Sequence, residues 1–144
     1  MPVNLVATVG RVILGAYFLL GGVSKIFGPA AIGAKQIAQM TAHGIPSAEY
    51  LFPLSGGCEI IGGLTLLLGL HTQLVALLLA GFTILVSVTM HKFWGAAATG
   101  DDEQFVQMIM FMKNMTTFAG LLAFAGFGSG PLAIDNFYRE RDTE

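Results

Sequence analysis

The stretch from Ile60 to His91, IIGGLTLLLGLHTQLVALLLAGFTILVSVTMH, decides the fold because it contains no Asp, Glu, Lys or Arg. A helix needs about 20 mostly apolar residues to cross a bilayer. The polar residues His71, Thr72 and Gln73 interrupt the stretch near its middle. The sequence therefore predicts two membrane-spanning helices that form a hairpin with its turn at residues 71–73.

The composition of the whole chain agrees with a membrane protein. Of its 144 residues, 54% are hydrophobic and 11% are charged, whereas soluble domains carry about 25% charged residues. The net charge of −2 provides no basic surface for nucleic acid. The single cysteine, Cys58, excludes a disulfide framework, and we expect it to be a small core residue.

Charged and polar residues divide the rest of the chain into further segments. The sequence predicts one membrane domain, 1–144, with an all-α fold: an integral membrane four-helix bundle. The expected spans are 3–27, 48–69, 74–94 and 104–127. A short interfacial helix is expected within 28–47, since Gly28-Pro29 and Gly44-Ile-Pro46 bound a short amphipathic stretch. The loop 95–103 carries three acidic residues that place it in water, and 131–144 forms a polar tail.

We expect the protein to lie in the inner membrane of the cell. An even number of spans places both termini on the same side of that membrane. Arg139 and Arg141 lie outside the expected spans on that side, which favours a cytoplasmic position for both termini. The first span lacks a basic leading segment and is interrupted by Arg11, so we expect it to be retained rather than cleaved.

Polar and small residues share one face of each expected span. Charged groups inside a membrane are costly and mark candidate functional positions, while small residues allow close helix contacts. The face of span 3–27 consists of Arg11, Gly15, Phe18, Gly22 and Lys25, and that of span 48–69 consists of Ser55, Gly56, Glu59, Gly62 and Gly63. The face of span 74–94 consists of Ala80, Ser87, His91 and Trp94, and that of span 104–127 consists of Lys113, Asn114, Thr116, Thr117 and Gly120. We expect these faces to meet in a polar bundle interior.

Depth along the helices suggests a partner for Glu59. At about 1.5 Å per residue, Glu59 and Lys113 lie at similar depths, and Arg11 lies toward the opposite side. Glu59 is therefore expected to pair with Lys113 or with Arg11, either as a structural ion pair or within a binding site. Lys25 either extends to the membrane surface or lines that site. His91 and Trp94 either anchor the helix end at the interface or line the site.

Metal and haem sites are not expected. His43, His71 and His91 occupy different loops or helix ends, without the HxxxH or HExxH spacing of a metal site.

The motifs in their order resemble the DoxX family of small four-helix membrane proteins. The resemblance runs from about Arg11 to Asp135. It rests on Arg11-Val-Ile-Leu-Gly15, Gly22-Val-Ser-Lys25, Met40 with Gly44-Ile-Pro46, Glu59 with Leu-Leu-Leu-Gly69 and Thr72, His91-Lys-Phe-Trp94, Lys113-Asn114 and Leu132-Ala-Ile-Asp135. The family often has Gly-Pro-Gly at the last turn, where this chain has Gly128-Ser-Gly-Pro131.

This resemblance implies an association with quinones or membrane redox assemblies. The first functional hypothesis is a redox-associated membrane subunit that binds a quinone or another small organic molecule in a polar intramembrane pocket. Its binding residues would be Lys25, Glu59, His91, Trp94, Lys113 and Asn114, with Glu59, His91 and Lys113 as the catalytic candidates.

Two alternatives remain open. In the first alternative, the chain would be a non-enzymatic accessory subunit that contacts a partner protein or another copy of itself. In the second, it would be a small carrier or channel. Whether it is an enzyme is left open.

Overall fold

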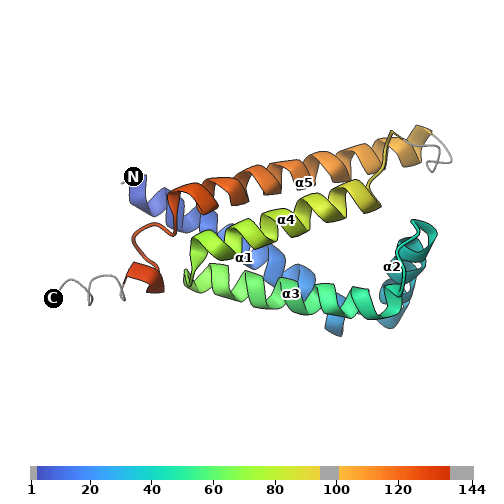
Figure 1. Cartoon of the computed structure of the whole chain (residues 1–144), viewed down its shortest axis with the longest axis horizontal. Helices are drawn as coiled ribbons and strands as arrows, with labels where there is room; N and C mark the ends of the chain where they lie inside the picture. The colour runs from blue at the N-terminus through green and yellow to red at the C-terminus, as the bar shows by residue number, and fades with distance from the viewer. Residues whose placement is uncertain (1–2, 95–100, 137–144) are drawn as a thin grey trace.

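The computed structural model describes residues 3–94 and 101–136, and in these ranges the long regular elements are helices (Figure 1). They are α1 (Val3–Phe27), α2 (Ala30–Ala42), α3 (Ala48–Leu68), α4 (Thr72–Met90) and α5 (Asp101–Phe127). All except α2 are long and apolar enough to cross a membrane. The predicted all-α fold with four membrane-spanning helices is confirmed.

Helices α1 and α3 run antiparallel with their backbones in direct contact. A Cβ atom on Gly22 would lie 2.5 Å from the carbonyl oxygen of Gly56, and one on Gly15 would lie 2.8 Å from the backbone nitrogen of Leu67. Gly63 likewise faces the backbone of α1. Small residues allow this close approach. The glycines of the two predicted faces therefore fix the register of α1 against α3.

Helices α4 and α5 form the second closely packed pair, and few contacts join α1 to α5. The two pairs meet in an apolar core to which both contribute. It consists of Phe18, Leu66, Ala76, Leu79, Ala80 and Leu121. Away from this core the pairs diverge, so that α4 and α5 are separated from α3 at the end of the molecule that carries α2 (Figure 1).

Helix α2 lies across that end of the bundle (Figure 1). It follows Pro29, and the chain after it turns at Gly44, whose φ of +79° suits glycine. None of its residues is buried. Its position at the membrane interface stays a prediction.

The boundaries of α4 and α5 differ from those expected. Helix α4 begins at Thr72, whose backbone N–H donates to the carboxylate of Asp135, a residue distant in sequence. The helix ends at Met90 rather than at Trp94. The expected loop 95–103 is also shorter, because α5 already begins at Asp101. Acidic residues in a first turn favour a helix start through the helix dipole. The expected loop residues 95–100 and the tail residues 137–144 lie outside the described residues.

Candidate functional site

An ion pair joins α1 to α3 inside the bundle. Lys25 lies in the last turn of α1, and its Nζ is 2.7 Å from Oε1 of Glu59 in α3. The same ammonium group donates to the hydroxyl of Ser55 at 3.3 Å. Only 8% of Glu59 is exposed. Because Ser55 and Glu59 are one helical turn apart, both face Lys25.

The expectation that Glu59 pairs with Lys113 or Arg11 is wrong. The antiparallel glycine contacts place the end of α1 beside Glu59 and place Arg11 beside the other end of α3. Lys25 therefore turns inward to Glu59 instead of extending only toward the membrane surface. The depth of each residue in the membrane, estimated from the sequence, could not show this pairing, because depth contains no information on which helices are in contact.

One oxygen of Glu59 remains available. Its Oε2 is buried and has no hydrogen-bond partner among the residues that the structure describes. The ammonium of Lys25 also lies over the ring of Phe82 in α4, 5.7 Å from the ring centroid. Three helices thus contribute to what we call the Lys25–Glu59 site: Lys25 from α1, Ser55 and Glu59 from α3, and Phe82 from α4.

A second polar contact joins the end of α4 to α5. Nδ1 of His91 is 2.8 Å from Oε1 of Gln107, which accepts the ring N–H. Burial lowers the pKa of His91 below its usual value. The hydrogen bond to Gln107 acts in the opposite direction, while the positive charges of Lys113 and His43 add to the lowering. His91 is therefore a neutral hydrogen-bonding group at neutral pH.

The other predicted site residues take different positions. Lys113 is exposed on α5, with its Nζ 5.9 Å from the centroid of the Tyr17 ring. Its neighbour Asn114 is buried. Trp94 is 56% exposed and packs edge-on against Phe93 and Phe111, after the end of α4. Trp94 is thus part of an aromatic cluster.

The predicted site residues therefore fall into separate groups. Within the described ranges, no hydrogen bond or ion pair connects the Lys25–Glu59 site to His91, Trp94 or Lys113. Sequence reasoning missed Phe82 and Gln107. Gln107 carried a signal, since it is a polar residue in an apolar span and lies seven positions before Asn114, on the same helix face.

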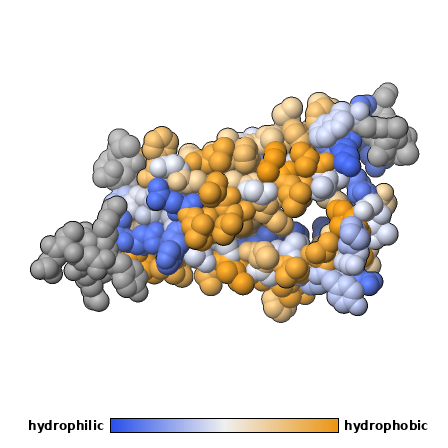
Figure 2. Space-filling model, viewed as in Figure 1, coloured by the Kyte–Doolittle hydropathy of each residue, from blue (hydrophilic) through white to orange (hydrophobic). Residues whose placement is uncertain are grey.

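The molecular surface is open between the two helix pairs. Figure 2 shows a hollow between α2, α3 and α4, with hydrophilic surface beside it. Lys25 lies in the last turn of α1, just before α2, so the Lys25–Glu59 site belongs to this half of the molecule. Diverging helix pairs leave this half less tightly closed than the core.

Arg11 holds the opposite end of the bundle together. Its guanidinium donates to the backbone carbonyl of Leu66 at 2.9 Å, to that of Leu67 at 3.0 Å, and to that of Leu132. Only 1% of Arg11 is exposed. The last carbonyls of a helix lack intrahelical partners and carry partial negative charge. Arg11 therefore caps α3 instead of pairing with Glu59.

Asp135 complements this cap at the start of α4. Its carboxylate accepts hydrogen bonds from the backbone N–H groups of His71 at 2.7 Å and Thr72 at 3.0 Å. Burial by itself would raise the pKa of Asp135, but the hydrogen bonds from Thr72 and His71 outweigh it, and the pKa lies below its usual value. The α3–α4 turn is thus held from both sides by residues distant in sequence.

Cys58 departs from the expected core position. It is exposed on α3, directly before Glu59 in the chain. Within residues 3–94 and 101–136, no group of three or more His, Cys, Asp or Glu side chains is arranged to hold a metal ion.

Comparisons with known proteins agree with this architecture. The DoxX family model matches residues 6–92, which is more than half of the chain and runs from the first turns of α1 to just beyond the end of α4. The chain is also similar to the inner membrane protein YqjF of Escherichia coli strain K12, with 34% identity over 133 residues that cover 92% of each chain. No solved structure matches the chain. The matches in sequence and the four apolar helices lead to one conclusion: the chain belongs to the DoxX family of membrane proteins.

Proposed function

We propose that the chain binds a quinone, or a small organic molecule with similar hydrogen-bonding oxygens, at the Lys25–Glu59 site. The observation that carries the proposal is the buried Oε2 of Glu59, which has no partner in the described part of the chain. Buried polar groups are nearly always satisfied, so such an atom marks a place where a ligand can bind. A quinol hydroxyl is a suitable donor to it.

Lys25 provides the complementary group. An ammonium has three N–H donors, and Lys25 uses them toward Glu59 and Ser55. One donor remains for a quinone carbonyl. The ring of Phe82 beside the ammonium provides the apolar contact that an aromatic headgroup favours. A quinone carries electrons and protons within a bilayer, and this chain's own groups would bind and orient it there.

Access to the site is supported by the arrangement of the helix pairs. Few contacts join α1 to α5, and the hollow in Figure 2 opens in the same half of the molecule. An amphipathic ligand in the membrane would approach between the pairs. His91, at the end of α4, and Asn114 and the exposed Lys113, both on α5, belong to the opposite helix pair and would contact the ligand from that side.

Native mass spectrometry on gently extracted protein tests the proposal. We expect a quinone-sized molecule to copurify with the wild type and with Glu49→Gln, a matched change in the first turn of the same helix. Glu59→Gln and Phe82→Leu should each lower its occupancy about tenfold, as expected for loss of one good contact. Equal occupancy in Glu59→Gln and the wild type, with both folded by circular dichroism, contradicts the proposal.

A second candidate function is a non-enzymatic accessory subunit of a membrane complex or homo-oligomer. It is favoured by the observation that Lys25 and Arg11 both bind groups of this chain itself, which suits a structural role. Protein partners without any small ligand in the same experiment would support this alternative. The carrier or channel hypothesis receives no comparable support from the observed contacts.

We further propose that the protein lies in the inner membrane with both termini in the cytoplasm. The similarity to an inner membrane protein supports the location. Helix α1 begins and α5 ends at the same end of the bundle (Figure 1), and the sequence beyond α5 contains Arg139 and Arg141. A reporter fused after Glu144 that is active only in the periplasm should be inactive.

A further inference from the structure

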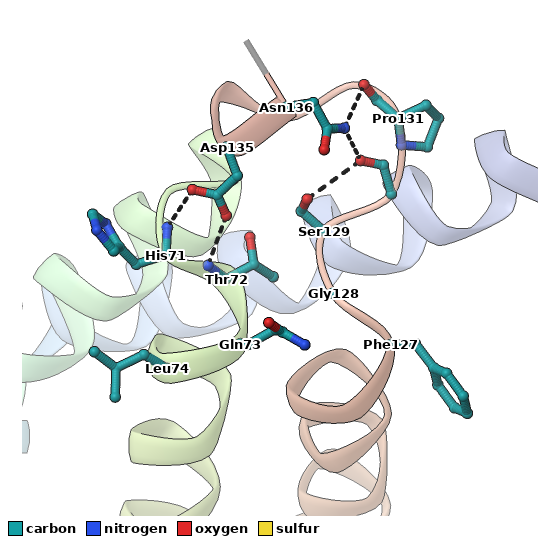
Figure 3. A pocket seen from close by; sticks show the side chains of 11 residues that line it. His71, Thr72, Gln73, Leu74, Phe127, Gly128, Ser129, Pro131, Asp135 and Asn136 are labelled. Carbon is teal, nitrogen blue, oxygen red and sulfur yellow. Dashed lines mark hydrogen bonds between the residues drawn. The ribbon is translucent and has the colours of Figure 1, made fainter. Parts of the chain in front are cut away.

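A cavity of about 660 Å³ opens where α4 begins and α5 ends (Figure 3). Its polar lining includes Thr72, Gln73, Ser129 and Asp135. Its volume lies within the range of about 300–1,000 Å³ that is typical of small-molecule sites. Because two candidate spans have an end here, we expect the cavity to lie at the depth of the lipid headgroups. It is at the opposite end of the bundle from α2 and is independent of the Lys25–Glu59 site.

One side of this cavity presents hydrogen-bond acceptors. Both carboxylate oxygens of Asp135 accept backbone N–H groups, and Asp135 forms no salt bridge within the described residues. Thr72 is 1% exposed, and its hydroxyl makes no hydrogen bond there. In Figure 3 that hydroxyl points into the space between Asp135 and Ser129, and its nearness helps to keep the carboxylate charged. These groups suit a cation that can donate hydrogen bonds.

The adjacent side presents donors. The first intrahelical hydrogen bond at this end of α4 runs from the N–H of Val75 to the carbonyl of His71. The N–H groups of Gln73 and Leu74 precede it, in the turn where backbone donors lack intrahelical partners. The helix dipole adds partial positive charge at the same place. This side suits an anionic oxygen, such as that of a phosphate.

We propose that the cavity binds the headgroup of a zwitterionic phospholipid with a primary ammonium, namely phosphatidylethanolamine. The phosphate would lie at the first turn of α4 and the ammonium between Asp135 and the Thr72 hydroxyl. Leu74 and Phe127 form an exposed apolar rim for the acyl chains. In Figure 3 the side chains of Leu74 and Phe127 point away from the polar centre.

Charge and hydrogen bonding separate this headgroup from other lipids. A purely anionic headgroup, such as phosphatidylglycerol, brings a second negative charge to Asp135 without the ammonium that offsets it. A phosphatidylcholine headgroup has the same net charge, but its quaternary ammonium has no N–H to donate. The cavity should therefore prefer the primary ammonium to both.

Native mass spectrometry of the full chain with the three lipids, matched in acyl chains and mixed in equal amounts, tests this preference. Wild type should retain phosphatidylethanolamine about tenfold more than either other lipid. Thr72→Val should remove most of the preference, and circular dichroism checks that its fold persists. Thr116→Val removes an exposed hydroxyl of α5 and should keep the preference.

Three outcomes overturn the proposal. They are equal retention of the three lipids by the wild type, full preference in Thr72→Val, and displacement of the lipid by soluble phosphoethanolamine, which would assign the cavity to a soluble ligand. Should Thr72→Val fail to fold, Ser129→Ala replaces it, with a smaller loss of preference expected because Ser129 already donates to the carbonyl of Gly130.

Discussion

Removal of one or both charges of the Lys25–Glu59 pair should have unequal effects on stability. Lys25→Met leaves the Glu59 carboxylate buried without its cation. The double variant Lys25→Met/Glu59→Gln removes both charges and preserves most of the volume. We expect the single variant Lys25→Met to be much less stable than the double variant, although it carries fewer changes.

The contact distance gives the scale of this difference. At 2.7 Å and an effective dielectric constant of about 20, the attraction between the two charges is about 6 kcal/mol. The loss of hydration of both groups offsets most of it, so the intact pair adds little net stability. Removing one partner leaves an uncompensated buried charge and costs about 3–5 kcal/mol. The double variant should lose less than about 1.5 kcal/mol, the usual limit for changes that conserve volume.

Equilibrium unfolding in mixed micelles of increasing SDS content, followed by circular dichroism, measures these free energies. The wild type, Lys25→Met, Glu59→Gln and the double variant form a double-mutant cycle, for which we expect a coupling energy of at least about 2 kcal/mol. Glu49→Gln, an acid change in the exposed first turn of α3, serves as the control.

Additive losses in the cycle would refute this reasoning, because they would show that the two charges do not interact in the folded protein. A Lys25→Met variant within about 0.5 kcal/mol of the wild type, the range of ordinary surface changes, would refute it as well.

Three further predictions concern the helix contacts and the ends of the bundle. Gly22→Ala should destabilise the protein by about 1–3 kcal/mol, since its Cβ would lie 2.5 Å from the carbonyl oxygen of Gly56. Gly57→Ala, where a Cβ meets no atom within 4 Å, should be neutral or stabilising in the same unfolding assay. Arg11→Leu should lose about 3–5 kcal/mol, because it leaves the carbonyls of Leu66, Leu67 and Leu132 without this donor; a stability equal to that of the wild type would contradict the capping role. The pKa of His91 is lower in the folded state, so its contribution to stability is complete above about pH 6.5 and is lost as the pH falls below that value. His91→Gln should reduce the fall of the melting temperature between pH 7 and pH 5.

The apolar spans were predictable because membrane insertion depends on local properties of the chain. A helix in a bilayer satisfies its own backbone hydrogen bonds, so length and hydropathy suffice to identify it. The same holds for the faces of α1 and α3. Gly15, Gly22, Gly56 and Gly63 lie on the predicted stripes because helical periodicity places them there, and their backbones do face the neighbouring helix.

Ion pairing was not predictable in the same way. From charge and depth, the expected partners of Glu59 were Lys113 and Arg11, and Lys25 was not among them. The choice of Lys25 depends on the antiparallel register of α1 and α3, which the glycine contacts set. The start of α4 shows the same dependence, since Asp135 caps Thr72 from 63 residues away. Sequence by itself therefore determined which segments are long and apolar enough to cross a membrane, and which faces of α1 and α3 meet. The tertiary structure decided which charges meet, because each such contact depends on the packing of helices that are distant along the chain.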